Sequence, residues 1–246
     1  MPEQSLGIKR ACVLGASGGI GRAVVQLLLD DPDTLQVYTG SRTPHAALDP
    51  RETPFSFDLE DEASIAEAAG MIAQDGWLDL VFIATGLLHD GPDFKPEKSW
   101  RMQDPEAYQR AFAVNATGPA LVGKHFLPLL NRNERSVFAA LSARVGSTSD
   151  NRLGGWHAYR ASKAALNMIV RNFAIELSVR NTNAIAVTLH PGTVDTALSE
   201  PFQVRVAPEK LFTPEQAARH LLAVVAQLGD EDSGHLIGWD GRKIDP

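Results

Sequence analysis

Tyr159 and Lys163 are the residues in this sequence whose types and spacing could do chemistry. They lie four positions apart in the segment WHAYRASKAAL, whose pattern predicts a helix, so both side chains share one helix face. A tyrosine with its ordinary pKa of about 10 exchanges protons poorly at neutral pH. A neighbouring ammonium group stabilises the phenolate and lowers that pKa, so the pair could act as a general acid and base. Ordinary helix surfaces also carry this spacing, so it indicates little in isolation.

Two further polar residues gain meaning from their positions. Ser142 ends an apolar run that predicts a buried strand. Because the carboxyl ends of parallel strands face the ligand crevice, Ser142 could donate a hydrogen bond to a substrate carbonyl oxygen. Asn115 lies in the segment VNATGPA, within an apolar helical pattern. Its amide could satisfy a neighbouring backbone group, or it could hold a water molecule in a proton relay.

A glycine-rich turn connects the first apolar run to a helical pattern. It consists of Gly15, Ala16, Ser17, Gly18, Gly19, Ile20 and Gly21. A diphosphate binds where backbone N–H groups and the positive end of a helix point at it, and glycine leaves room for that approach. The strand–turn–helix setting therefore favours a dinucleotide site, with a tight turn that binds nothing as the alternative.

The residues after the second predicted strand favour NADP over NAD. In NAD-binding folds an acidic residue about 20 positions beyond the glycine turn holds the ribose 2′-hydroxyl. Here that place is taken by Ser41 and Arg42, which can donate hydrogen bonds to a 2′-phosphate. The alternative is that Arg42 is a solvent-exposed loop residue. Asp58 could meet the adenine amino group, or it could cap a helix that begins near Asp61.

The elements that must position these residues alternate along the chain. Strand-like runs lie at 8–14, 35–39, 54–57, 78–84, 136–142, 184–189 and 235–238, and helical patterns lie at 19–30, 61–74, 104–131, 156–180 and 214–227. Strands separated by helices need crossover connections and form a parallel sheet. We therefore predict an α/β fold with a single doubly wound, Rossmann-like parallel sheet and helices on both faces. No linker divides the chain, so we expect one domain over 1–246.

Composition restricts the partners and the location. The net charge of −7 disfavours nucleic acid and anionic membranes. Cys12 is the single cysteine, which fits a reducing compartment. The N-terminal MPEQSLGIKR lacks the apolar stretch of a signal peptide, and no apolar run has the length of a membrane span. We expect a cytoplasmic enzyme with a small-molecule substrate, and we assign no metal ligands.

Five motifs in order make the sequence resemble the short-chain dehydrogenases/reductases: GASGGIG, Asn115, Ser142, YRASK and HPGTVDT at 190–196. The resemblance covers nearly the whole chain. It is closest to the C-factor-like and Sniffer-type carbonyl reductases, on the segments IATGLLH, SDNRLGGWHAYRASKAALN and LHPGTVDT. Two departures are that Thr85 stands in an Ala-Thr-Gly where the family usually has Asn-Ala-Gly, and that Ser17 is not the basic residue of some NADP-specific members.

The resemblance implies an NADP-dependent oxidoreductase that moves a hydride between nicotinamide and a carbonyl or alcohol group, with NAD also possible. By this resemblance Tyr159 is the general acid in reduction, and Lys163 tunes it and binds ribose. Ser142 polarises the carbonyl group, and Asn115 supports the proton relay. The implied cofactor contacts are Gly15, Ser17, Gly18, Gly19, Ile20, Gly21, Ser41, Arg42, Asp58, Leu59, Ala84, Gly86, Tyr159, Lys163, Pro191, Gly192, Val194 and Thr196.

Residues 193–213 correspond to a mobile substrate loop in the family. Its apolar residues suggest a cover that excludes water on closure, with simple packing on the next helix as the alternative; they are Phe202, Val204, Val206 and Leu211. Trp156 and His157 could line the pocket or cap the helix, whereas we interpret His89 and His190 as structural. Because related proteins associate through helices corresponding to 156–180 and to part of 104–131, we expect a homodimer or homotetramer.

Two other functions compete with this interpretation. Nucleotide-sugar epimerases share Tyr-x-x-x-Lys, but they usually carry a larger C-terminal substrate domain than the roughly 50 residues that follow Thr196 here. A non-catalytic NADP-binding signalling or sensor protein is the second alternative, because C-factor-like relatives are associated with developmental signalling. The presence of Asn115, Ser142, Tyr159 and Lys163 together favours retained chemistry.

Overall fold

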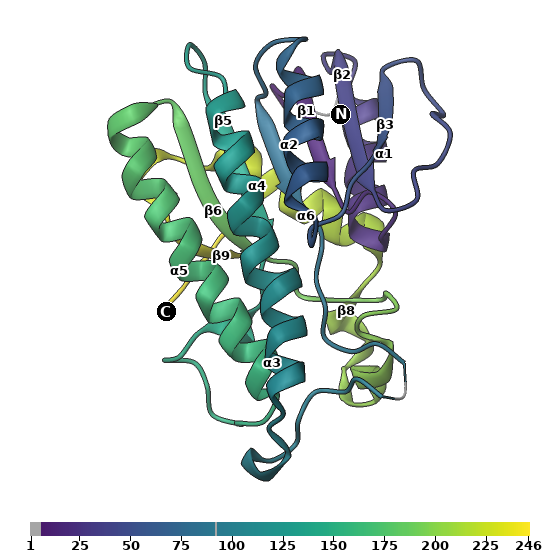
Figure 1. Cartoon of the computed structure of the whole chain (residues 1–246), viewed down its shortest axis with the longest axis vertical. Coiled ribbons are helices and arrows are strands. Elements are labelled where there is room, and N and C mark those ends of the chain that lie inside the picture. Colours follow the sequence, from purple (N-terminus) through teal and green to yellow (C-terminus); the bar gives the residue numbers. More distant parts are fainter. Residues whose placement is uncertain (1–5, 92) are drawn as a thin grey trace.

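The computed structural model describes residues 6–91 and 93–246, whose centre is an eight-stranded sheet (Figure 1). Its strands are β1 (Arg10–Leu14), β2 (Gln36–Ser41), β3 (Glu52–Ser56), β4 (Leu80–Ile83), β5 (Ser136–Leu141), β6 (Ala184–His190), β9 (Leu236–Gly238) and β10 (Lys243–Ile244). Their order across the sheet is β10-β9-β6-β5-β4-β1-β2-β3. Residues 1–5, part of the segment expected to lack a leader, lie outside the described residues.

Helices cover both faces of this sheet (Figure 1). On one face lie α1 (Gly19–Asp30) and α6 (Pro214–Gln227), and on the other lie α2 (Glu62–Ala73), α4 (Gly118–Phe126) and α5 (His157–Arg180). The short α3 (Pro105–Phe112) precedes α4 and packs on α5. The prediction of a doubly wound, mostly parallel sheet is confirmed. Over the described ranges, none of the helices has the length and hydrophobicity needed to cross a bilayer.

Consecutive strand residues feed two separate cores. Val13, on β1, belongs to the core under α1 and α6, whereas its neighbour Cys12 belongs to the core under α2, α4 and α5. Ala139 and Phe138 divide in the same way on β5. Because successive side chains point to opposite faces of a sheet, strands covered on both faces need apolar residues at every position. This explains why the strands lack polar alternation, and why burial raises the pKa of the Cys12 thiol.

The crossovers leave β1 in two directions. β1 pairs with β2 on one side and with β4 on the other, all in parallel. The chain therefore winds outward to β3 on one side of β1 and outward through β4, β5 and β6 on the other. Ligand crevices form at such a point, beyond the carboxyl ends of the strands where the helices on the two faces diverge. β1, β4, β5 and β6 end there, and the segments that follow them begin with Gly15, Ala84, Ser142 and Pro191, which are predicted site residues.

The predicted helical region at 104–131 is interrupted. A π-helical turn at Ala113–Thr117 separates α3 from α4, and α4 ends in a 3₁₀ turn at Leu127–Leu129. Pro119 explains part of this break, because proline has no N–H to donate to the carbonyl group of Asn115 four residues earlier. The π turn places Asn115 in the interior, where it is 1% exposed.

Two strand pairs went unpredicted. β10 runs antiparallel to β9 at the sheet edge, after a turn in which Gly241 has a φ of +77°. The preceding Asp240 completes an Asp-Gly pair, a turn signal that was present in the sequence. The second pair joins β7 (Thr193–Val194) to β8 (Leu211–Phe212), which ties together the two ends of the segment predicted as a substrate loop.

Candidate active site

Two adjoining cavities lie along the carboxyl ends of the strands. One has a volume of about 530 Å³ and reaches Ser142, Tyr159 and Lys163. The other has a volume of about 480 Å³ and reaches Ser41, Arg42, Asp58 and Leu59. The residues that line both are Gly18, Ala84, Thr85 and Gly86. The fold therefore brings the predicted catalytic residues and the predicted cofactor residues into one continuous depression.

The glycine turn has a backbone that other residues could not adopt. Gly15 has a φ of +86°, and a Cβ at this position would lie 2.9 Å from Thr85 Cγ2. A Cβ on Gly21 would lie 2.2 Å from the Gly15 carbonyl oxygen, so this glycine lets α1 begin close against the turn. Gly18 is the N-cap of α1, and no side chain accepts a hydrogen bond from the first N–H groups. Those N–H groups thus face an open cavity, which suits a diphosphate.

The second cavity holds polar groups without partners. The buried Ser41 Oγ and Thr85 Oγ1 make no hydrogen bond within the described structure. Arg42 is exposed at the cavity, and no ion pair or hydrogen bond joins its side chain to another described residue. Unsatisfied donors beside a free guanidinium fit an anionic ligand with many oxygen acceptors. The chain's own residues therefore fit a dinucleotide that carries an additional phosphate.

The alternative that Asp58 caps a helix is not what the structure has. Asp61 is the N-cap of α2, and its side chain accepts from the Ala63 N–H. Asp58 instead accepts from the Glu60 N–H at 3.0 Å, within the turn before α2. Its carboxyl group lines the second cavity, so contact with a ligand remains available to it.

The first two turns of α5 present Tyr159 and Lys163 to the first cavity. Trp156, the N-cap, has a φ of +52°, the one positive value at a non-glycine residue over the described ranges. Glu97 stabilises this helix start, because its backbone carbonyl accepts from the Trp156 N–H and its carboxylate accepts from the Ala158 N–H at 3.2 Å. These contacts fix the start of α5, two residues before Tyr159.

Burial governs the protonation of Tyr159 and Lys163. Desolvation raises the pKa of Tyr159 above its ordinary value and lowers the pKa of Lys163 to about 7. The expectation that Lys163 lowers the tyrosine pKa is therefore wrong for the chain without ligands. The ammonium nitrogen lies 5.9 Å from the ring centroid and donates to the Leu141 carbonyl at 2.9 Å, so its charge does not outweigh the loss of water around the phenol.

Ser142 follows directly after β5, as predicted, and lines the first cavity. Its hydroxyl donates to Asn167 Oδ1 at 2.8 Å. Asn167 lies on α5, one turn beyond Lys163. An amide can present either its oxygen or its nitrogen, so Asn167 can also donate to Ser142 and free the hydroxyl proton for a ligand. The sequence analysis missed Asn167, although its i, i+4 spacing from Lys163 was a usable signal.

Asn115 makes structural hydrogen bonds with its side chain. Oδ1 accepts from the Leu87 N–H, and Nδ2 donates to the Leu87 carbonyl and to Ser162 Oγ. These contacts satisfy neighbouring groups, the first of the two interpretations, and the part of Asn115 in a proton relay stays a prediction. The amide fastens the segment after β4 to α5, next to Gly86, where a Cβ would lie 3.6 Å from Lys163 Nζ and 3.7 Å from Asn115 Oδ1.

The segment after β6 closes the first cavity opposite α5. Pro191, Gly192, Val194 and Thr196 line it, and Gly192 has a φ of +81°. Its backbone packs under Phe212, because a Cβ on Gly192 would lie 2.8 Å from that ring. The methyl group of Thr196 approaches Gly19, where a Cβ would lie 2.9 Å from Thr196 Cγ2. The glycine turn and this segment thus contact each other at one side of the cavity.

The substrate loop is partly an apolar cover. Phe202 packs on Trp156 with ring centroids 4.9 Å apart, and His89 meets Phe202 edge-on while contacting the Ala197 carbonyl. Phe202 and Val206 line the cavity, but Val204 is 95% exposed and takes no part. The expectation for Val204 is therefore wrong, because it lies on the outer side of a 3₁₀ turn at Glu200–Arg205.

Among the remaining predicted residues, Leu211 lies in β8 and helps to close the base of the substrate loop. Trp156 lines the cavity, and it is also the N-cap of α5. His190 lines the cavity, and its buried Nδ1 has no partner among the described residues; burial is the main cause that lowers its pKa to about 4. His190 is therefore neutral at physiological pH. Glu97 was missed because nothing in its own sequence neighbourhood ties it to α5.

Comparison with known proteins places these features in context. A family model described as short chain dehydrogenase matches residues 9–205. The enzyme 1-hydroxy-2-glutathionyl-2-methyl-3-butene dehydrogenase of Rhodococcus sp. (strain AD45) is 31% identical over 235 residues, covering 93% of this chain and 96% of the relative. C-signal of Myxococcus xanthus is 36% identical over 135 residues, covering 55% of this chain and 76% of C-signal.

A solved structure gives the same arrangement of elements. The NADPH-bound carbonyl reductase from chicken fatty liver superposes with a TM-score of 0.83 at 23% identity, covering 97% of this chain and 94% of that chain. At this level of identity the superposition establishes the fold. The family model carries more, because its matched range includes the glycine turn, Ser142, Tyr159 and Lys163.

Proposed function

Because the chain belongs to the short-chain dehydrogenase family, which confirms the family predicted from its motifs, we propose that it is an NADP-dependent carbonyl reductase. It transfers a hydride between nicotinamide and a carbonyl or alcohol carbon, with Tyr159 as the general acid or base. The relative from Rhodococcus is named as a dehydrogenase, which supports chemistry at such a carbon. The match to C-signal agrees with the C-factor-like branch of the family.

One observation carries this proposal. The Tyr159 side chain and the Lys163 ammonium reach one cavity with Ser142, and that cavity runs without a break into the open end of the glycine turn. A buried phenol, a buried amine and a hydroxyl are the groups that carbonyl reduction needs around the oxygen atom. A family resemblance without this juxtaposition would support only a dinucleotide site.

Each residue then has a defined task. NADPH, when bound, supplies the hydride to the carbonyl carbon. Tyr159 donates its phenolic proton to the carbonyl oxygen as negative charge grows there, and its raised pKa keeps it protonated beforehand. Ser142 donates a hydrogen bond to the same oxygen when Asn167 donates to it in turn. Lys163 supplies positive charge near Tyr159 and binds ribose hydroxyl groups. Asn115 holds the Leu87 backbone in place. The products are an alcohol and NADP⁺.

The choice of NADP rests on the second cavity. Arg42 and the unpartnered Ser41 Oγ lie where a ribose 2′-substituent would be, and no acidic residue follows β2 directly. A phosphate can accept from both groups, whereas the 2′-hydroxyl of NAD prefers a carboxylate partner. The solved chicken enzyme is described as NADPH-bound, which supports the same choice.

The remaining expectations extend this proposal. We take residues 1–246 as one NAD(P)-binding domain in which 193–213 is the substrate loop, and we place the enzyme in the cytoplasm as a homo-oligomer. A non-catalytic NADP sensor stays the alternative, favoured by the similarity to a protein named C-signal. The two functions share the cofactor site and differ in whether Tyr159 transfers a proton.

Titration with NADPH and NADH tests the cofactor site. Wild type should bind NADPH more tightly than NADH, and Arg42→Asp should weaken NADPH binding at least tenfold, since it replaces a phosphate partner by a repelling charge. Arg132→Asp is the control, a charge reversal at an exposed residue that precedes β5 and lines neither cavity. Tighter binding of NADH would refute the assignment of Arg42, and binding of neither nucleotide would refute the oxidoreductase.

Tyr159→Phe separates the reductase from the sensor. The variant keeps the ring that packs on Trp156 with centroids 6.2 Å apart but loses the proton donor. We expect turnover of an aromatic aldehyde to fall by a factor of about 10²–10⁴. NADPH binding, measured by the titration described above, should be retained. A wild-type protein that binds NADPH and yet reduces no carbonyl compound from a broad panel would favour the sensor.

A further inference from the structure

The substrate end of the first cavity joins an apolar wall to positive charge. Beyond Ser142 and Tyr159 its wall consists of Leu88, Val145, Trp156, Leu198, Phe202 and Val206. No aspartate or glutamate is among the described residues that line the cavity, although the chain has a net charge of −7. The lysine and arginine residues there are Lys163, which is directed to the Leu141 carbonyl and whose pKa burial lowers to about 7, and Arg144.

Arg144 is placed for contact with a substrate. It opens the 3₁₀ turn Arg144–Gly146, two residues after Ser142, so its backbone follows directly from the strand that ends at the reacting group. Arg144 is itself among the residues that line the cavity, so a substrate that enters the cavity can reach it. Its charge also helps to lower the pKa of His190, after burial and against the opposing charges of Asp240 and Asp150.

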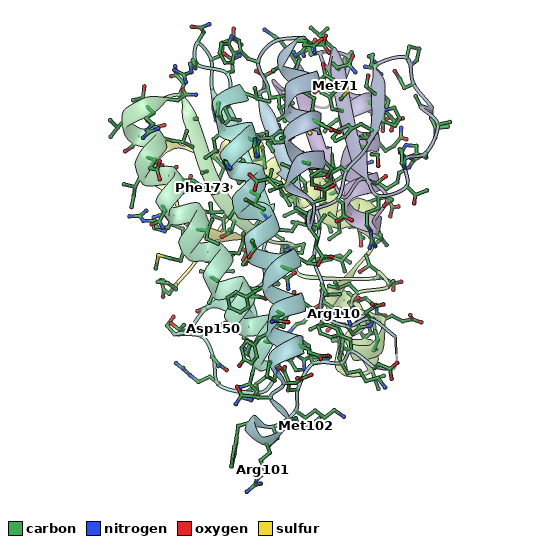
Figure 2. The ribbon with its side chains drawn as sticks, in the orientation of Figure 1. Met71, Arg101, Met102, Arg110, Asp150 and Phe173 are labelled. Carbon is green, nitrogen blue, oxygen red and sulfur yellow. The ribbon has the colours of Figure 1, made fainter. Side chains whose placement is uncertain are left out.

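The one ion pair of Arg144 in the described structure is weak. Nη1 lies 3.4 Å from Asp150 Oδ2, and the two side chains are 51% and 47% exposed. Exposed pairs of this kind contribute little to stability, because water screens them. Asp150, labelled in Figure 2, belongs to the loop that leads toward α5. A carboxylate that arrives beside the apolar wall, with less water around it, competes well for the same guanidinium group.

We propose that Arg144 binds a carboxylate of the substrate, so that the enzyme prefers carbonyl compounds that join an aromatic or other apolar body to a carboxylate group. The apolar body packs on Trp156 and Phe202, the carbonyl oxygen meets Tyr159 and Ser142, and the carboxylate replaces Asp150 on Arg144. This inference rests on the proposed reductase function and adds the substrate class. Asp150 then acts as an internal competitor that occupies Arg144 until substrate binds.

A matched pair of aldehydes tests the inference. The probes are 4-formylbenzoate and its methyl ester, which share the ring and the reacting group and differ in charge. The measured quantity is the ratio of kcat/KM for the acid to that for the ester, with NADPH saturating. Wild type should favour the acid at least tenfold. Arg144→Gln should lower the ratio at least tenfold, and Arg144→Lys should lower it less, because the charge remains without the planar fork.

Asp150→Asn should change the ratio of acid to ester kcat/KM in the opposite direction. It removes the competing carboxylate and leaves the cavity lining intact, so the ratio should rise above that of wild type. A general disturbance of the loop would instead change acid and ester together. The paired variants therefore separate charge recognition from damage to the fold.

The outcomes distinguish this inference from the reaction itself. Reduction of both aldehydes with a ratio near one, or a ratio that Arg144→Gln leaves unchanged, overturns the carboxylate site while the reductase stands. If NADPH binds and neither aldehyde is reduced, the proposed reaction fails. Calorimetric binding of the acid and the ester to the NADP-loaded protein then decides the carboxylate site: tighter binding of the acid that is lost in Arg144→Gln supports it, and equal binding overturns it.

Discussion

At the scale of single residues, burial decides how the site is charged. Tyr159 and Lys163 are both buried beside the cavity, where each loses the water that would stabilise its ionised form. Burial keeps the phenol protonated and lowers the pKa of the amine to about 7. A reductase needs a neutral phenol at the start of the reaction, so the environment of Tyr159 suits proton donation. When the cofactor binds, it adds its own charge to the site.

The titration of Lys163 predicts how stability depends on pH. Its pKa is about 7 in the folded chain, against 10.5 for an ordinary exposed lysine, so between these values the unfolded chain binds the proton that the folded chain has released. Stability of the ligand-free wild type should therefore rise with pH across this window relative to Lys163→Met, by a few kcal/mol in total. Below about pH 7 the difference should be constant.

Urea unfolding of the two proteins at about pH 6 and about pH 9 measures this effect. The loss of the hydrogen bond to Leu141 in the variant adds an offset that does not depend on pH, and the other titrating groups cancel in the difference. A difference in unfolding free energy that stays the same at both pH values would contradict a buried, depressed lysine.

At the scale of elements, the site depends on where two helices begin. α1 begins at a turn that leaves its N–H groups uncapped, and α5 begins at Trp156, where Glu97 from a distant loop supplies the acceptors. Unsatisfied N–H groups suit an anionic ligand at the first helix, whereas satisfied ones fix the angle of the second. One helix start is thus left open for binding, and the other is closed to position Tyr159.

Gly21 should be the position in the turn that is least tolerant of a side chain. A methyl group there would lie 2.2 Å from the Gly15 carbonyl oxygen, so Gly21→Ala must push α1 away from the turn. We expect a loss of about 1–3 kcal/mol in unfolding free energy, together with weaker NADPH binding, measured by denaturation and by titration.

Gly70→Ala is the matched control for this substitution. Gly70 lies within α2, and nothing is found within 4 Å of its added Cβ. Alanine is the better helix former, so this variant should gain about 0.5–1 kcal/mol. Equal unfolding free energies for the two variants would refute the close approach at the turn.

At the scale of the whole molecule, one helix face is left unburied. Met168, Ile175 and Val179 share a side of α5 and are 62%, 55% and 84% exposed. Phe173, labelled in Figure 2, packs instead inward against Phe138 and Gly123. An apolar stripe on a long helix at the molecular surface marks a contact between proteins. It agrees with the homo-oligomer that we propose.

Ile175→Glu should therefore shift the chain toward the monomer. A charge on this face costs more in an interface than on a free surface, so light scattering coupled to size exclusion should give a smaller mass for the variant than for wild type. Leu35→Glu is the control, since Leu35 is 62% exposed before β2 and belongs to no such stripe. A wild type that is already monomeric would rule out the proposed oligomer.

Local pattern was enough for much of this protein. The alternation of apolar runs and helical periods determined the parallel sheet, because only crossover helices join such strands, and the glycines of the first turn carry a geometric requirement that is visible in the sequence. Tyr159, Lys163 and Ser142 could be grouped because strand ends and helix faces follow from the same pattern. The order of the motifs along the chain then indicated the family.

Only the tertiary structure decided the interactions between residues that are distant in the sequence. Glu97 caps α5 from a loop about 60 positions away, and the amide of Asn115 bonds to the Leu87 backbone and to Ser162. The pKa directions of Tyr159 and Lys163 depend on how much water the folded chain excludes, which no spacing reveals. The charge of the substrate pocket is likewise a property of which side chains meet there. Such properties arise from packing between segments that are distant in the sequence, and the pattern of residues along the chain does not specify that packing.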